Sequence, residues 1–141
     1  MKERLTQKIG RIREYLALVN SLKEDCEAKF IADPVYRGAM LHYLYLLADT
    51  CVTLAEILIK FKGLRPPQSY HEAFDILGEA KILEPAFAYS FAKIAGFRNF
   101  LAHDYEKIDA KLICQEILAQ SDDIEEYLLQ VGKKIMPTTE G

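Results

Sequence analysis

A long apolar segment, about residues 34–62, constrains the fold of this chain more than any other part of it. It begins at Asp33-Pro34, which favours a helix start because the Asp side chain can cap the helix and Pro fits its first position. It ends at Gly63, which stops helices, followed by Pro66-Pro67, which cannot continue one. A helix that is apolar on nearly all sides needs neighbours all round it. We therefore predict that this is the central helix of a bundle, with one narrow polar stripe formed by His42, Asp49, Thr53, Glu56 and Lys60.

Four further helices are predicted around this one. Residues 69–72 match a capping box and open a short helix that ends near residue 80. A fourth helix is expected from Glu84-Pro85 to about His103, and Asp109 can cap a fifth that continues to about residue 128. The first segment shows apolar residues at alternating steps of four and three, which is the spacing of one helix face; they are Leu5, Ile9, Ile12, Leu16 and Val19.

The sequence shows neither the alternation of strands nor an internal repeat. We predict an all-α fold, an up-and-down helical bundle of about five helices. A length of 141 residues, 50% of them hydrophobic, suits one domain with one core. The domain is expected to span residues 1–132, and residues 133–141 are expected to form a flexible C-terminal tail.

The charge balance gives no general attraction for nucleic acid. The net charge is −3 and the pI is about 5.6, so any contact with RNA must come from a local patch. A basic face on the first helix, formed by Arg4, Lys8 and Arg11, is either ordinary solvated surface or a surface that steers RNA.

The cysteines and the N-terminus predict a cytoplasmic protein. Cys26, Cys51 and Cys114 are odd in number and widely spaced in apolar segments, so we expect reduced, buried thiols and neither a disulfide nor a zinc site. The first residues carry no secretory signal. Asp49 and Glu56 interrupt the long apolar segment, which excludes a membrane span there.

The segment from Arg98 to Tyr105 contains the residues best suited to chemistry. Arg98 can clamp a phosphate through its planar guanidinium, and His103 can take or give a proton near neutral pH. Tyr105 offers a hydroxyl that can donate, accept or be modified. The pattern Arg-x4-His-x-Tyr is therefore suited to a phosphodiester.

Helix geometry limits how these side chains can meet. Arg98 and Tyr105 lie seven residues apart, nearly on one face, whereas His103 is rotated from Arg98 by roughly 140°. Either the helix ends or distorts near Ala102, or a partner chain supplies one of the two groups. A single His cannot readily serve as both base and acid, and a two-fold dimer would supply two.

Simpler roles are open for each of these residues. Arg98 can be a surface cation, His103 a group that caps the helix C-terminus, and Tyr105 a packing side chain. Asp49 and Glu56 are either solvated or orient Arg98 from the neighbouring helix. His42 and His71 are expected to be structural.

The motif resembles the signature of the HEPN superfamily, and specifically of HepT-like ribonuclease toxins, in which a polar residue such as Asn99 often follows the Arg. The resemblance extends over about residues 5–130. The further segments that are similar to HepT, in the same order, are Phe30–Gly38, Gly63–Pro67, Tyr70–Phe74 and Ala95–Asn99.

The resemblance implies a metal-independent RNA endonuclease, the toxin of a type VII-like toxin-antitoxin pair, which leaves a 2',3'-cyclic phosphate and a 5'-hydroxyl. Arg98 and His103 would be catalytic in a cleft at a homodimer interface, with Asn99 in support and with neither a metal nor a cofactor. The implied partners are RNA and an MNT-type nucleotidyltransferase antitoxin that adenylylates Tyr105, with no role for DNA or a membrane. The alternative is a non-catalytic HEPN module that binds nucleotides or serves as a scaffold for a nucleotidyltransferase, which the acidic pI fits at least as well.

Overall fold

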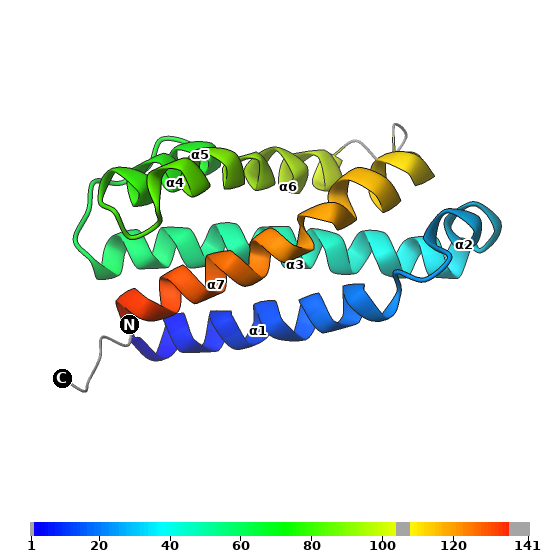
Figure 1. The fold of residues 1–141 in the computed structure, drawn as a ribbon, viewed down its shortest axis with the longest axis horizontal. Coiled ribbons are helices and arrows are strands. Elements are labelled where there is room, and N and C mark those ends of the chain that lie inside the picture. Colours follow the sequence, from blue (N-terminus) through cyan, green and yellow to red (C-terminus); the bar gives the residue numbers. More distant parts are fainter. Residues whose placement is uncertain (1, 104–107, 136–141) are drawn as a thin grey trace.

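The helices are arranged around the long helix α3 (Pro34–Phe61), as the sequence predicts (Figure 1). The computed structural model describes residues 2–103 and 108–135. All regular elements within these ranges are helical, which confirms the all-α prediction. The other elements are α1 (Lys2–Ser21), α2 (Cys26–Ala32), α4 (Tyr70–Glu79), α5 (Pro85–Phe91), α6 (Lys93–His103), a π-helical stretch η2 (Leu112–Ile117), a 3-10 turn η3 (Leu118–Gln120) and α7 (Ser121–Ile135).

Helix α3 is covered on opposite sides. The helix α1 runs along one side of α3, while α4, α5 and α6 lie along the other, and α7 crosses the bundle (Figure 1). The consecutive residues Ile57, Leu58 and Ile59 are all buried, which requires packing partners over more than half of the helix circumference. Near the middle of α3, the Tyr127 hydroxyl of α7 donates to the Cys51 carbonyl oxygen at 2.8 Å. The C-terminal half of α3 is therefore buried over most of its circumference, whereas His42 and Lys60 of its polar stripe are exposed.

The start of α3 is capped as predicted. Asp33 lies in extended backbone, and its Oδ1 accepts from the backbone N–H groups of Val35 (3.0 Å) and Tyr36 (3.3 Å). Pro34 occupies the first turn, where its missing N–H removes no helical bond.

The loop between α3 and α4 is held by a small polar network. The Ser69 half of the predicted capping box is present, because Ser69 Oγ accepts from the Glu72 N–H at 3.0 Å; the Glu72 carboxylate accepts at 2.5 Å from the N–H of Gln68, one residue before the cap. Arg65 donates to Glu72 at 3.2 Å and to Glu79 at 3.0 Å. The Gln68 N–H and then Arg65 lower the pKa of Glu72. These bonds fix the position of residues 65–69, which border α6.

The fourth predicted helix is in fact two helices. The segment expected to run from residue 84 to His103 is divided at Ala92 into α5 and α6. The Ala92 N–H still reaches the Ala88 carbonyl at 3.0 Å, but the Ala95 N–H bonds the Ala92 carbonyl, three residues back, at 3.0 Å. This tighter turn separates the two helices. Helix α2 was not predicted at all.

The last predicted helix begins where expected but is irregular. Asp109 Oδ1 accepts from the Leu112 N–H at 2.9 Å, which confirms the cap. The chain then passes through η2 and η3 before α7 begins. Helix α7 runs to Ile135, three residues beyond the expected boundary at 132, because Ile135 is buried. Residues 136–141 lie outside the described residues.

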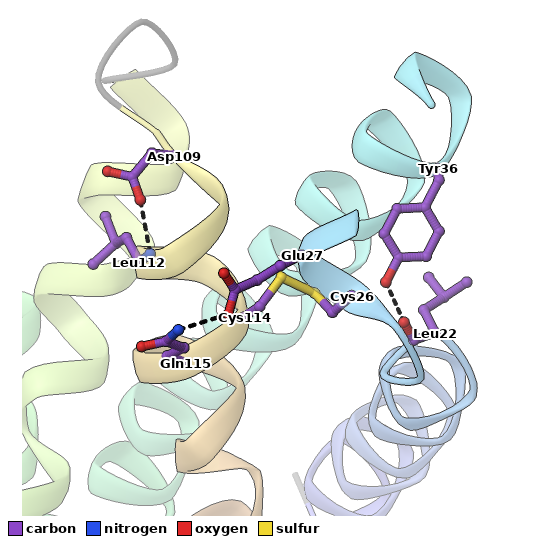
Figure 2. Close-up of a disulfide and its surroundings, with 8 residues drawn as sticks. All are labelled: Leu22, Cys26, Glu27, Tyr36, Asp109, Leu112, Cys114 and Gln115. Atoms are coloured by element: carbon purple, nitrogen blue, oxygen red, sulfur yellow. Dashed lines mark hydrogen bonds between the residues drawn. A yellow bond between two sulfur atoms is a disulfide. The ribbon is translucent and has the colours of Figure 1, made fainter. Parts of the chain in front are cut away.

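A disulfide joins Cys26 and Cys114, so the expectation of three reduced thiols is wrong for these two (Figure 2). Cys26 begins α2 and Cys114 lies in η2, with their Cα atoms 5.8 Å apart. Beside the bond, Gln115 Nε2 donates to the Glu27 carboxylate at 2.6 Å. The two cysteines lie 88 positions apart in the sequence and α2 was not predicted, so no local pattern indicates that they meet.

Cys51 follows the prediction. It is a free thiol buried in the middle of α3, and burial raises the pKa of the thiol well above its ordinary value. A thiol in this setting stays protonated and inert.

Each helix within residues 2–103 and 108–135 is too short or too polar to pass through a lipid bilayer.

Reducing the disulfide should lower the free energy of unfolding by about 2–4 kcal/mol, because the bond restricts a long segment of the unfolded chain. Urea unfolding of the oxidised protein with and without a phosphine reductant measures the difference. Cys26→Ser should match the reduced protein, and the reductant should not alter this variant further. Equal stability of oxidised and reduced protein would contradict the prediction.

Candidate active site

The Arg98 guanidinium is held by two side chains of α3. Its Nε donates to Asp49 Oδ1 at 3.0 Å, and its Nη2 donates to the Tyr45 hydroxyl at 3.3 Å. The Arg98 side chain is 17% exposed and the Asp49 side chain 36%. Of the two roles left open for Asp49, solvated carboxylate or partner of Arg98, the structure shows the second. Helix α6 is thereby fixed against α3 at the motif.

Two aromatic rings contact the same guanidinium. Its Cζ lies 4.9 Å from the centre of the Tyr70 ring and 5.5 Å from the centre of the Tyr45 ring. Both distances are within the range of cation–π attraction. Tyr70 is the first residue of α4, so the polar network of the preceding loop also positions the ring beside Arg98. Three helices thus converge on one cation.

Some N–H groups of the Arg98 guanidinium are not used by these contacts. Besides the bonds to Asp49 and Tyr45, Nη1 donates to the side-chain oxygen of Asn99 at 3.2 Å. A guanidinium has five N–H groups. Two of them, one on each terminal nitrogen, have no hydrogen-bond partner among the described residues. They can bind an anion that approaches Arg98.

The surroundings of Arg98 favour its charged form. Burial disfavours the charge, but the hydrogen bond that Arg98 donates to Asp49, together with nearby groups, outweighs this effect, so the pKa of Arg98 is raised. Glu56 lies two helical turns beyond Asp49 on α3. Burial and then the Asp49 carboxylate raise the pKa of Glu56, while Arg98 and Lys60 act in the opposite direction.

His103 is the last residue of α6 and is exposed. Helix α6 is regular through Ala102 and ends at His103, which agrees with the alternative in which the helix ends near Ala102. In a regular helix five residues correspond to a rotation of roughly 140°, which directs His103 away from Arg98. In the described part of the chain, no hydrogen bond joins these two side chains.

Tyr105 lies outside the described residues, so its position on the same helix face as Arg98 stays a prediction. His42 is exposed on α3, and His71 Nδ1 lies 3.4 Å from Asp75 Oδ2 on α4. Tyr45 was missed by the sequence analysis, although its place one helical turn before Asp49 puts it on the same face of the helix.

A hollow of about 340 Å³ lies next to the guanidinium. It is formed by α3, the loop before α4, the start of α4, and α6. Its lining residues are Glu56, Pro67, Gln68, Ser69, Tyr70 and Asn99.

Comparison with known proteins gives a consistent result over most of the chain. Residues 6–131 match the family described as Ribonuclease HepT-like. The mRNA nuclease HepT of Shewanella oneidensis is 20% identical over 128 residues, which cover 91% of this chain and 96% of that protein. The tRNA nuclease HepT of Aphanizomenon flos-aquae is 34% identical over 89 residues, which cover 62% of this chain and 58% of that protein.

The fold is similar to that of a solved toxin. The tri-AMPylated HEPN toxin of Shewanella oneidensis, in complex with an MNT antitoxin, superimposes with a TM-score of 0.81 at 18% identity. The match covers 93% of this chain and 98% of the toxin. At this identity the likeness concerns the fold.

Replacing Asp49 with Asn should release Arg98 and lower the pKa of Glu56, because a like charge is removed from its surroundings. The loss of one charge-assisted hydrogen bond at a partly exposed site should cost about 1 kcal/mol of stability. Titration of the Glu56 side chain by NMR, together with urea unfolding, measures both effects. Asp75→Asn, on α4 beside His71, is the matched control and should leave the Glu56 titration unchanged. An unaltered Glu56 titration in Asp49→Asn would contradict this electrostatic account.

Proposed function

This chain belongs to the family of HepT-like ribonucleases, and from that premise we propose that it is a metal-independent RNA endonuclease, the toxin of a type VII-like toxin-antitoxin pair. The observation that carries the proposal is the state of Arg98. Its guanidinium is oriented by Asp49 and Tyr45 and keeps two N–H groups for an anion, five residues before an exposed His103.

The role proposed for Arg98 is to bind the scissile phosphate. When the RNA 2'-OH attacks the adjacent phosphorus, negative charge grows on the phosphorane oxygens. A guanidinium that is already held in place can stabilise this charge without reorganising during the reaction. Because Arg98 supplies the positive charge, this mechanism requires no divalent metal ion. Cleavage by this route leaves a 2',3'-cyclic phosphate and a 5'-hydroxyl.

The role proposed for His103 is proton transfer. The 2'-OH must lose a proton as it attacks, and the leaving 5'-oxygen must gain one. An imidazole can perform either transfer near neutral pH. One chain supplies one motif His, and this residue is directed away from its own Arg98 by the helix. We therefore propose a two-fold homodimer in which the two motifs face one cleft and supply two His and two Arg side chains.

We propose regulation by an MNT-type nucleotidyltransferase that adenylylates Tyr105. The support is the relative from Shewanella oneidensis, which is AMPylated and bound to an MNT antitoxin. An AMP group near Arg98 would add negative charge and phosphate oxygens that compete with RNA for the free N–H groups. The proposed site of action is the cytoplasm, with RNA as substrate and without a role for DNA or a membrane.

Arg98→Ala and His103→Ala should each reduce RNA cleavage at least 100-fold, since one donor to the developing charge contributes about 10²–10³ in rate and a positioned acid–base group about 10²–10⁴. Cleavage by the unmodified protein should persist in EDTA. His71→Ala, which alters an exposed His on α4, is the matched control and should cleave normally. In a heterodimer of one normal chain and one His103→Ala chain, activity should be nearly lost, because both His residues act on one phosphodiester.

Retention of half the activity in that heterodimer would contradict the shared cleft. A folded normal protein that cuts no RNA but binds the transferase would overturn the nuclease and favour the scaffolding alternative. A strict requirement for Mg²⁺ would overturn the mechanism assigned to Arg98.

Tyr105→Phe should escape inactivation by the antitoxin, because it lacks the hydroxyl that accepts AMP, and it should still cleave RNA. The experiment incubates the protein with the transferase and ATP, then measures intact mass and RNA cleavage. Tyr89→Phe is the matched control, since Tyr89 is an exposed tyrosine on α5 outside the motif. Equal AMP addition to normal protein and Tyr105→Phe, or full activity of the modified normal protein, would show that Tyr105 is not the control point.

A further inference from the structure

The hollow beside Arg98 shares two of its walls with the arginine clamp. Tyr70 and Asn99 both line the hollow, and both also contact the guanidinium of Arg98. The guanidinium Cζ lies 4.9 Å from the centre of the Tyr70 ring, and Nη1 lies 3.2 Å from the Asn99 side-chain oxygen. A ligand in the hollow therefore lies directly beside an anion bound to Arg98. In a strand of RNA, the group next to a phosphate is a nucleoside.

We propose that this hollow binds one unpaired base of the RNA strand and so determines which phosphodiester is cleaved. The inference rests on the proposed nuclease function and specifies its substrate. Its volume of about 340 Å³ is at the small end of ligand sites, which suits one base rather than a larger ligand. Tyr70 offers an aromatic ring and Pro67 an apolar wall, which suit the faces of an unstacked base.

The polar groups of the hollow favour a particular kind of base. The Glu56 carboxylate can only accept hydrogen bonds, and no hydrogen bond or ion pair reaches it from the described residues. The Asn99 side-chain oxygen is occupied by Arg98, so its NH₂ group is the part left to donate. An acceptor and a donor side by side match the edge of a base that carries an exocyclic amino group next to a ring nitrogen acceptor, as in adenine or cytosine. In the proposed orientation Glu56 lies at the exocyclic group and Asn99 at the ring nitrogen, so uracil would present a carbonyl oxygen to the carboxylate and an N–H to the amide NH₂.

The surroundings also supply a path for the rest of the strand. A second hollow of about 640 Å³ shares Glu56 and Pro67 with the first and is lined further along by Lys60 of α3 and Arg4 of α1. These two cations line the hollow that adjoins the first one and can bind phosphates of neighbouring nucleotides. Such a local basic path is what a chain with a net charge of −3 needs for contact with RNA.

The test uses short RNA oligonucleotides that carry 2'-O-methyl groups at all positions except one, so that one phosphodiester can be cleaved. The bases on either side of this bond are varied among A, C, G and U. The normal protein should prefer A or C over U at one of the two positions by about 5- to 150-fold in kcat/KM, which is the range for one bidentate base contact. Glu56→Gln should lose most of this preference, because an amide can also donate to the uracil carbonyl.

Two further variants separate the base contact from general damage. Gln68→Ala removes another lining side chain without removing the backbone N–H that bonds Glu72, and it should weaken the preference less than Glu56→Gln does. Glu125→Gln, on the exposed face of α7, removes the same charge elsewhere and should keep the preference of the normal protein. An unchanged base preference in Glu56→Gln at both positions would overturn the base pocket while leaving the nuclease intact.

If the normal protein cleaves none of these substrates, the proposed nuclease function fails separately. Binding is then measured by fluorescence anisotropy with fully 2'-O-methylated oligonucleotides of the same sequences. A preference for A or C that Glu56→Gln removes would still support the pocket. Equal affinity for all sequences, or no binding, would overturn it.

Discussion

The contact between Arg98 and Asp49 links the fold of this protein to its site. Much of helix α3 is buried, and the Asp49 carboxylate on its polar stripe, 36% exposed, takes a partner from a neighbouring helix. Arg98 supplies this partner from α6 and is in turn enclosed by Tyr45 and Tyr70. Partly buried ion pairs add little net stability, but they discriminate strongly between alternative packings because an unpaired charge is costly. The pair links α6 to α3 at this position, and the same contacts leave two N–H groups of Arg98 without a partner among the described residues.

The sequence predicted those parts of the structure that depend on local physics. The apolar run of α3, the Asp33 cap and the Ser69 cap each rest on residues within a few positions of one another, and the structure confirms all three. The parts that were missed depend on tertiary packing. The Cys26–Cys114 bond joins segments 88 residues apart, and the turn at Ala92 carries no Gly or Pro that would mark it.

The site shows the same division. The motif residues and a link from Asp49 to Arg98 could be anticipated from spacing and polarity. The enclosing rings could not, because Tyr45 and Tyr70 come from different helices and aromatic residues are common in cores. The sequence also left open how Arg98 and His103 could meet. Helix α6 is regular up to His103, so the two residues keep the helical spacing of five positions, and a cleft shared by two chains is our proposal for how they act together.

The disulfide has a topological consequence for the motif. With Cys26 bonded to Cys114, residues 26–114 form a closed covalent ring that includes α3 to α6 and the whole segment from Arg98 to Tyr105. Helices α1 and α7 are then two arms attached at the junction of this ring. One peptide-bond cut within the ring opens the ring, but the disulfide still joins the two resulting pieces. Both arms therefore stay in one molecule. A cut in either arm releases a fragment. In the oxidised protein, one protease cut within residues 26–114, the part that carries the motif, therefore releases no fragment.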